Sequence, residues 1–394
     1  AGMRCIEALL DMAQDRYEVT VIGEEPWGNY NRIMLSPVLS GDKTIDDIML
    51  HPHAWYSDKG IRFIAGDPAV RIDRPRKQVY TEKGEVVDYD RLILATGSKP
   101  FIPPIAGADL KGVISFRDIY DINTMLDYCK TKKNAVVIGG GLLGLEAAYG
   151  LKQRGMNVTV LHLMDRIMER QLDSKASQML RHSIEQKGIS IITEANTEAL
   201  VGVDGHVTQI RLKDGTVLEA DLVVFAVGIR PNMALAQSAG LRCNRGVLVN
   251  DTMQTFDPSI YAVGECIEHR SQTFGLVEPL WGQAFICASH LAEHGSLTFK
   301  APTVPTQLKV SGCDVFSAGN FEPKDDFEDI ILNDEKRQIY KRIIIQKDKV
   351  VGAVLFGDTE DGVWYAELIS DQTPISSIRN KLLFGKDFAL KKAG

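Results

Sequence analysis

The stretch NAVVIGGGLLGLEAAYGLKQRGMNVTVLHL, residues 134–163, decides the fold. An apolar segment, Ala135–Ile138, is followed by three glycines in G-x-G-x-x-G spacing: Gly139, Gly141 and Gly144. A small-residue segment of helical character follows, and then a second apolar segment, Val158–Val160. Strand, glycine turn, helix and strand in this order form the dinucleotide-binding fingerprint. The sequence therefore predicts a helix whose N-terminal N–H groups and dipole face a pyrophosphate.

The opening AGMRCIEALLDMAQDRYEVTVIGEEP, residues 1–26, repeats the second part of this pattern. Gly2 corresponds to Gly144, and Val19–Val21 corresponds to Val158–Val160. We interpret the opening as the later part of a second fingerprint: the sequence begins one residue before the last glycine of the motif. A first strand and a G-x-G turn are then expected to precede Ala1 in the natural protein. The alternative is an unrelated amphipathic helix followed by a strand.

Composition limits the class of protein. The 394 residues suit two or three domains, and 44% hydrophobic and 25% charged residues are ordinary for a globular protein. The formal net charge of −7 argues against nucleic acid as the main partner. The longest apolar runs have the length of strands, so no transmembrane helix and no membrane partner are expected.

The six cysteines are scattered, and no two of them form a C-x-x-C pair. They are Cys5, Cys129, Cys243, Cys266, Cys287 and Cys313. This spacing argues against a thioredoxin-like dithiol and against a four-cysteine zinc or iron–sulfur site in these residues. We therefore predict no metal site, and reduced, mostly structural thiols in a cytoplasmic protein.

The order of the patterns predicts one dinucleotide domain inserted in another. Residues 1–108 and 246–300 form the first domain, and residues 109–245, with the complete fingerprint, form the second. From residue 301 to 394 strands alternate, as in RQIYKRIIIQKDKVVGAVLFG (337–357) with a turn at Lys347–Lys349, and helices follow. The predicted fold class is α/β, with two nested Rossmann-like domains and a C-terminal α+β domain.

Five motifs in this order resemble the two-dinucleotide-domain flavoprotein reductases, such as rubredoxin, putidaredoxin and glutathione reductases. They are the two fingerprints, ATG at 95–97, AVGIRPN at 226–232 and IYAVGE at 260–265. Four further stretches are most similar to the flavin module of assimilatory NAD(P)H-nitrite reductase large subunits: NYNRIMLSPVLSG (29–41), VLHLMDRIMERQLD (160–173), EPLWGQA (278–284) and TQLKVSGCDVFSAG (306–319). In that family, iron–sulfur and sirohaem domains follow the module, so the natural chain is expected to continue after Gly394.

The resemblance implies that residues 1–108 and 246–300 bind FAD. Glu24, with Glu25 as the alternative, is expected at the adenosine ribose, and a solvated turn acid is the competing interpretation of either residue. Gly264 and Glu265 would lie near the ribityl chain and pyrophosphate, with Glu in place of the more common Asp. The other expected FAD contacts are Gly2, Arg32, Ser36, Val70, Ala95, Thr96, Gly97 and Trp281. Relatives often carry Lys where this chain has Pro37, so a lysine–glutamate pair at the flavin is in doubt.

The resemblance also implies that residues 109–245 bind NAD(P)H. The expected contacts are Gly139, Gly141, Leu142, Leu143, Gly144, Glu146, His162 and Gly228, with Glu146 near the nicotinamide. At the end of the second strand an acid would favour NADH, and an arginine would favour NADPH. The chain has His162 there, with Arg166 and Arg170 only later. The absence of an arginine immediately after the strand favours NADH.

The resemblance further implies hydride transfer from the nicotinamide to the flavin, with no catalytic side chain. Residues 26–60 contain no cysteine, so the electrons are expected to leave for another redox centre. Three hypotheses follow: a module that feeds iron–sulfur and sirohaem centres for nitrite reduction, a free-standing rubredoxin or ferredoxin reductase, or a non-enzymatic redox-sensing flavoprotein. Residues 301–394 are expected to form a homodimer surface or to dock the acceptor.

Overall fold

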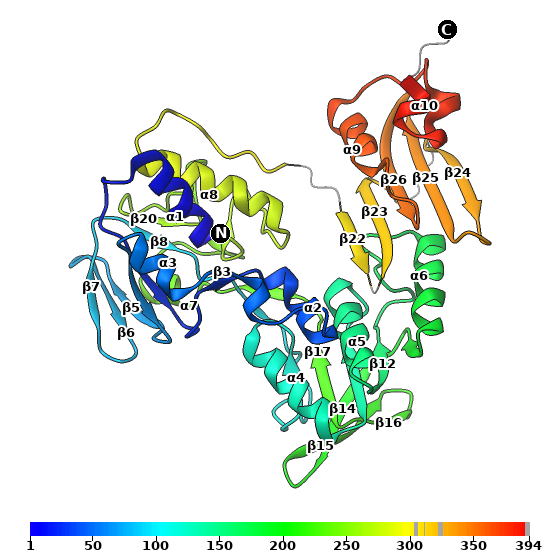
Figure 1. Cartoon of the computed structure of the whole chain (residues 1–394), viewed down its shortest axis with the longest axis horizontal. Coiled ribbons are helices and arrows are strands. Elements are labelled where there is room, and N and C mark those ends of the chain that lie inside the picture. The colour runs from blue at the N-terminus through cyan, green and yellow to red at the C-terminus, as the bar shows by residue number, and fades with distance from the viewer. Residues whose placement is uncertain (303–305, 311, 322–325, 391–394) are drawn as a thin grey trace. The chain divides into compact units, whose positions relative to one another are not determined.

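The computed structural model describes residues 1–302, 306–310, 312–321 and 326–390 (Figure 1). The chain divides into two compact units. The first unit comprises residues 1–34, 44–101 and 228–302, and the second comprises residues 35–43, 102–227 and 303–394. The three predicted domains stay a prediction. The units divide the chain at other positions: residues 228–245 and 301–302 belong to the first unit, and residues 35–43 and 102–108 belong to the second with the complete fingerprint and the rest of the C-terminal segment.

The first unit begins with the predicted helix and strand. In α1 (Gly2–Ala13), Cys5 and Leu9 are buried one turn apart, and the helix packs on α8 (Val277–Leu291). β1 (Thr20–Gly23) then pairs in parallel with β4 (Arg62–Ala65). The helix and the strand expected in this stretch are therefore present, and the parallel partner of β1 comes from later in the chain.

Parallel pairing also joins the two sequence halves of the first unit. β8 (Leu92–Leu94) pairs with β20 (Ile260–Ala262), and the turns after these two strands therefore lie at the same edge. The other strands are β2 (Asn29–Tyr30), β3 (Met49–His51), β5 (Ala69–Asp73), β6 (Gln78–Thr81), β7 (Val86–Asp88), β9 (Ser98–Pro100), β18 (Ile229–Pro231), β19 (Val247–Leu248) and β21 (Ile267–Glu268). The short helices are η1 (Arg32–Met34), η2 (Asp46–Ile48), α3 (His53–Asp58) and α7 (Ala234–Ser238).

The second unit contains a five-stranded parallel sheet in the order β10-β17-β11-β12-β13. The central strands β11 (Asn134–Ile138) and β17 (Leu222–Phe225) are apolar and almost entirely buried, as expected for a sheet covered on both faces. The remaining strands are β10 (Val113–Ser115), β12 (Asn157–Leu161) and β13 (Ile189–Ile192), and the helices are α2 (Leu35–Ser40), α4 (Ile119–Thr131), α5 (Leu142–Gln153) and α6 (Ser174–Gln186).

Two antiparallel sheets complete the second unit. One consists of β14 (Thr197–Val203), β15 (His206–Leu212) and β16 (Val217–Glu219). The other is the predicted C-terminal α+β part, in the order β22-β23-β26-β25-β24, with α9 packed on it (Figure 1). Its elements are β22 (Thr306–Val310), β23 (Cys313–Gly319), β24 (Glu328–Asp334), β25 (Ile339–Gln346), β26 (Lys349–Phe356), α9 (Gly362–Asp371), η3 (Arg379–Phe384) and α10 (Lys386–Leu390).

The predicted turn at 347–349 is one residue too long. Lys347 and Asp348 both have positive φ angles, 47° and 60°, and Lys349 already pairs with Gln346. Positive φ at both central residues is typical of a two-residue hairpin turn, whose twist matches that of the strands. Within the described residues, no helix combines the length and apolar character needed to span a membrane.

Asp173 connects the C-terminal sheet to the dinucleotide-binding part of the second unit. Its carboxylate caps α6 by accepting the N–H of Ala176 at 3.0 Å. It also accepts the Tyr340 hydroxyl at 2.8 Å and an Arg342 N–H at 3.2 Å. The other guanidinium nitrogen of Arg342 lies 2.9 Å from Asp329. Because Asp173 and Arg342 are nearly buried, this carboxylate compensates a charge that would otherwise be costly.

We expect Asp173→Ala to lower the free energy of unfolding of the second unit by about 2 kcal/mol, because a helix cap and a partly buried ion pair are lost together. Chemical denaturation followed by circular dichroism measures this. Asp127→Ala is the matched control, since the Asp127 carboxylate is 72% exposed and pairs with the equally exposed Lys130. Equal stability of the two variants would contradict the structural role of Asp173.

Candidate dinucleotide-binding sites

The fingerprint turn of the second unit is closed by backbone contacts that only glycine permits. Gly139 has φ +126°, and a Cβ there would lie 2.3 Å from the carbonyl oxygen of Ala226. A Cβ on Gly144 would lie 1.8 Å from the carbonyl oxygen of Gly139. Both distances are far below van der Waals contact. The two glycines therefore let α5 start directly at the end of β11.

The middle glycine has the opposite environment. A Cβ at Gly141 would meet no described atom within 4 Å, and its φ of −83° suits any residue. Gly141 precedes the first turn of α5, whose N–H groups have no acceptor inside the helix. Open space beside free N–H groups and the positive helix end suits an anionic group. A pyrophosphate therefore fits the turn formed by Gly139, Gly141, Leu142, Leu143 and Gly144.

His162 follows β12 and is bonded at both ring nitrogens. The N–H of Gly140 donates to Nδ1 at 3.0 Å, so Nε2 carries the proton and donates to the Glu169 carboxylate at 3.1 Å. His162 therefore links the backbone of the fingerprint turn to the side chain of Glu169. The acid at this strand end is Glu169, which the sequence interpretation missed because it lies seven residues further along the chain. Asp165 lies closer to the strand end in the sequence, so no local pattern marked Glu169 as the partner of His162.

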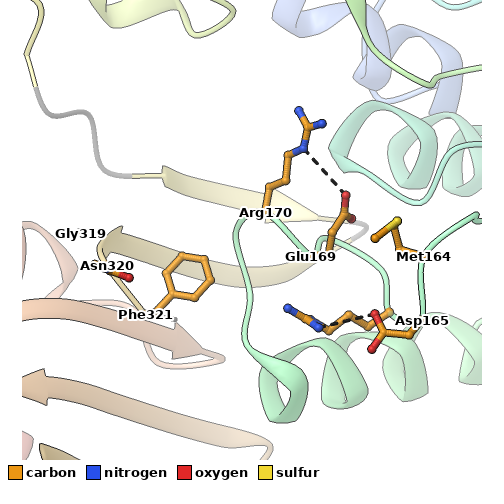
Figure 2. A pocket seen from close by; sticks show the side chains of 8 residues that line it. Met164, Asp165, Glu169, Arg170, Gly319, Asn320 and Phe321 are labelled. Carbon is orange, nitrogen blue, oxygen red and sulfur yellow. Dashed lines mark hydrogen bonds and ion pairs between the residues drawn. The ribbon is translucent and has the colours of Figure 1, made fainter. Parts of the chain in front are cut away.

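A cavity of about 550 Å³ lies beside Glu169. Figure 2 shows Glu169, Arg170, Met164 and Asp165 on one side of it and Asn320 and Phe321 on the other. The remaining lining residues are Arg166 and Gly319. Arg166 lies 3.5 Å from Asp165, and Arg170 lies 3.9 Å from Glu169. Each arginine that lines the cavity thus has an acid beside it.

Glu146, expected near the nicotinamide, lies in the second turn of α5 and is largely buried. The Ser36 hydroxyl of α2 donates to its carboxylate at 2.6 Å. Burial raises the pKa of Glu146, and the hydrogen bond from Ser36 opposes this shift. Ser36 was predicted as a flavin contact, but the structure places it in the second unit with Glu146.

In the first unit, two acids follow β1. Glu24 is exposed, whereas Glu25 accepts the Tyr30 hydroxyl at 2.6 Å and pairs with Arg32. The Arg32 guanidinium also lies 4.9 Å from the centre of the Tyr30 ring. The carboxylate of Glu25 and the guanidinium of Arg32 thus engage each other, and Glu24 is the more accessible candidate for a ribose.

The two turns after β8 and β20 are held by polar contacts. The Thr96 hydroxyl donates to the carbonyl oxygen of Asn232 at 2.6 Å, and the Asn232 N–H donates to the carbonyl oxygen of Gly97 at 2.9 Å. Glu265 accepts the Ser98 hydroxyl at 2.8 Å. These contacts bring the predicted residues Thr96, Gly97 and Glu265 to one edge of the unit. Asn232, the last residue of the AVGIRPN motif, and Ser98 were not predicted as their partners.

Gln283 of α8 supplies evidence that a polar ligand fits this edge. Its side-chain oxygen accepts the N–H of Gly264 at 2.8 Å, which orients the amide. The side chain is fully buried, and its Nε2 has no hydrogen-bond partner among the described residues. Gly264 has φ +97°, so the turn brings backbone close to this amide. An unpartnered buried donor beside a glycine turn fits the oxygen-rich linker of a dinucleotide.

The other predicted flavin residues also lie in the first unit. A Cβ on Gly2 would lie 2.8 Å from that of Ala95, so these two positions are adjacent. Val70 on β5 and Trp281 on α8 are 51% and 57% exposed. Gly228, predicted with the nicotinamide cofactor, clusters with the first unit, because its carbonyl oxygen accepts the N–H of Phe101 and β18 pairs with β9.

A complete dinucleotide turn in one unit, and an edge suited to a second dinucleotide in the other, define a two-dinucleotide oxidoreductase. The chain belongs to the pyridine nucleotide-disulphide oxidoreductase family, which matches residues 1–283. This membership confirms the predicted fold class and the predicted cofactors, FAD and NAD(P)H. Residues 305–373 match the rubredoxin NAD+ reductase C-terminal domain.

Similar proteins include the nitrite reductase [NAD(P)H] of Bacillus subtilis, 49% identical over 95% of this chain and 47% of that protein. The assimilatory nitrate reductase electron transfer subunit of the same organism is 42% identical over 97% of this chain and 50% of its own length. The chain thus spans about half the length of these relatives. The structure of NADH:rubredoxin oxidoreductase from Clostridium acetobutylicum is 27% identical, with a TM-score of 0.80 over 95% of this chain and 94% of that one.

Substitution of single glycines can distinguish two roles in this turn: close packing of the backbone and room for the ligand. We expect Gly141→Ala to leave stability unchanged and to weaken NADH binding about tenfold, because its methyl group enters the open space at the helix end. Gly144→Ala should instead destabilise the second unit by about 3 kcal/mol, through overlap with the Gly139 carbonyl. Titration calorimetry and thermal denaturation measure the two effects. Unchanged NADH affinity in Gly141→Ala would contradict this placement of the pyrophosphate.

Proposed function

We propose that this chain is the NADH-oxidising flavin module of an assimilatory nitrite reductase. The observation that carries the proposal is the 49% identity to a nitrite reductase [NAD(P)H] over 95% of the chain. The match extends over the whole module, including the C-terminal sheet, and covers about half of that relative. We place the module in the cytoplasm, where NADH is supplied, and assign the electrons to an iron–sulfur or sirohaem centre.

In this proposal the protein binds and orients the two cofactors, and the cofactors supply the redox chemistry. The chemistry that bound FAD would supply is acceptance of a hydride from the nicotinamide and release of single electrons. The turn at Gly139–Gly144 holds the NADH pyrophosphate. Glu24 and the edge formed by Thr96, Gly97, Gly264 and Glu265 hold FAD. Glu146, which follows this turn on α5, would serve the nicotinamide half.

NADH is favoured over NADPH by the charges around the cavity beside Glu169. The adenosine ribose of a bound dinucleotide lies at the end of the second strand, here β12. Glu169 brings a carboxylate to this place, which suits ribose hydroxyls and repels a 2′-phosphate. Arg166 and Arg170 lie beside Asp165 and Glu169, so neither arginine is reserved for a phosphate.

A free-standing rubredoxin or ferredoxin reductase is the second candidate. The match of residues 305–373 to a rubredoxin reductase C-terminal domain favours it, as does the NADH:rubredoxin oxidoreductase whose structure is similar along 94% of its length. In both candidates the C-terminal sheet serves as the acceptor's docking surface or as a homodimer surface.

The acceptor decides between the two candidates. We expect the FAD-loaded chain to oxidise NADH with ferricyanide or a viologen dye, to reduce rubredoxin slowly, and to leave nitrite unreduced. Residues 1–394 correspond to about half of the nitrite reductase and contain no C-x-x-C pair for a cluster. Stopped-flow absorbance and nitrite consumption measure these rates. Rapid rubredoxin reduction would favour the second candidate, and nitrite reduction by these residues alone would refute the division of labour.

The cofactor preference has its own test. We expect Glu169→Gln to lower the ratio of kcat/KM for NADH over NADPH about tenfold, because the charge that opposes a 2′-phosphate is removed while Arg166 and Arg170 remain. Steady-state dye reduction with each cofactor gives the ratio. Glu185→Gln is the matched control, since Glu185 pairs with Arg181 on α6 and does not line the cavity. An unchanged ratio in Glu169→Gln would remove Glu169 from the adenosine site.

A further inference from the structure

The short helix α2 contacts α5 along a row of residues on one face of α5. Glu146, Gly150 and Arg154 are spaced four residues apart and therefore lie on one face of α5. Glu146 accepts the Ser36 hydroxyl at 2.6 Å. At Gly150 a Cβ would lie 2.7 Å from Cγ of Leu39, so this glycine admits the leucine. Arg154 donates to the carbonyl oxygens of Leu39 and Val38 at 2.7 and 3.0 Å.

This row of residues ends at the dinucleotide site. Side chains on a helix lean toward its N-terminus, so the Glu146 carboxylate lies over the turn that contains Leu142 and Leu143. That turn carries the N–H groups assigned to the pyrophosphate. Ser36 therefore contacts the α5 side chain that follows this turn. Leu143, one turn before Glu146, is 44% exposed.

Glu146 has few other charged neighbours. The elements α2, β11, β12, β13 and β17, which contact α5, contain no ionisable residue. By sequence, β22 contributes Lys309, and α5 itself contributes Tyr149 and Lys152. Arg154 lies two helical turns from Glu146 and is occupied by the α2 carbonyl oxygens. Among the described contacts, the Ser36 hydroxyl is thus the group that compensates a buried carboxylate.

We propose that Ser36 is a positioning residue: its hydroxyl holds the Glu146 carboxylate and directs it toward the dinucleotide site. An ionised carboxylate is a pure acceptor, which suits the amide and hydroxyl donors of a nicotinamide riboside. Because the adenosine half is assigned to the end of β12, Glu146 on α5 would serve the nicotinamide half. The inference rests on the proposed function, since it requires NADH at this turn.

The physical basis is the balance between burial and one hydrogen bond. Burial of Glu146 favours its neutral form and raises its pKa, and the Ser36 hydroxyl stabilises the charged form. Removal of the hydroxyl leaves burial unopposed among the described contacts. The carboxyl group then becomes protonated at a higher pH and can no longer act as a pure acceptor.

The test follows the titration of Glu146 directly. In the FAD-loaded protein with ¹³C-labelled glutamate carboxyl groups, the Glu146 resonance is identified by its absence in Glu146→Gln. We expect its titration midpoint to rise by about one pH unit in Ser36→Ala. Ser36→Thr, which keeps a hydroxyl, should titrate like the parent. The matched control is Ser40→Ala on the same helix, because the Ser40 hydroxyl bonds Pro37 and Asp42 instead. Equal midpoints in Ser36→Ala and Ser40→Ala would overturn the proposal.

A second measurement separates this inference from the proposed function. Calorimetric affinity for NAD+, measured across the pH range of the titration, should fall on the acid side in the parent. The fall should begin about one pH unit higher in Ser36→Ala and be absent in Glu146→Gln. The same acid-side fall in Glu146→Gln would overturn the role of Ser36 while leaving NADH oxidation intact. A parent protein that binds no NAD+ would overturn the proposed function itself.

Discussion

The structure depends on the close approach of α5 to the strand that precedes it. The carbonyl oxygen of Gly139 occupies the space that a side chain on residue 144 would need. This approach aims the N-terminus of α5 at the edge where β11 and β17 end. It also creates the open space over Gly141. A phosphate site of this kind is made mainly by the absence of side chains, because backbone N–H groups are useful only where a ligand can reach them.

Residues that support the turn lie outside the fingerprint. His162 accepts the Gly140 N–H on one ring nitrogen and donates from the other to Glu169, so a single imidazole joins the turn to the cavity that we assign to the adenosine. On another face of α5, α2 contacts Glu146 and Gly150. The chain leaves the first unit after Met34, forms α2 within the second, and returns to the first at Thr44. A segment that interrupts the first unit in the sequence thereby supplies a contact to a helix of the second unit.

The C-terminal sheet is attached to the rest of the second unit largely through polar groups. Asp173 caps α6 and also binds Tyr340 and Arg342, so the first turn of α6 and strand β25 share one carboxylate. Arg342 also donates to the carbonyl oxygen of Phe321, which lines the cavity beside Glu169. A polar attachment of this kind fixes orientation more than it adds stability, because burying charges has its own cost.

The sequence by itself determined the elements whose signal is local. The helix at Gly2–Ala13, the strand at Leu92–Leu94 and the fingerprint from Asn134 to Leu161 were predicted closely, because periodicity and glycine spacing are read within a few residues. The order of the patterns predicted that one dinucleotide domain is inserted in another, and the family resemblance supplied the two cofactors. The assignment of residues 35–43 and 228–245 to units, and the partners of His162, Glu146 and Glu265, were decided only by the tertiary structure. Those partners, Glu169, Ser36 and Ser98, are common polar residues separated from their targets by between 7 and 167 positions. Nothing local marks such a residue, since its role arises only when packing brings two distant segments within hydrogen-bonding distance.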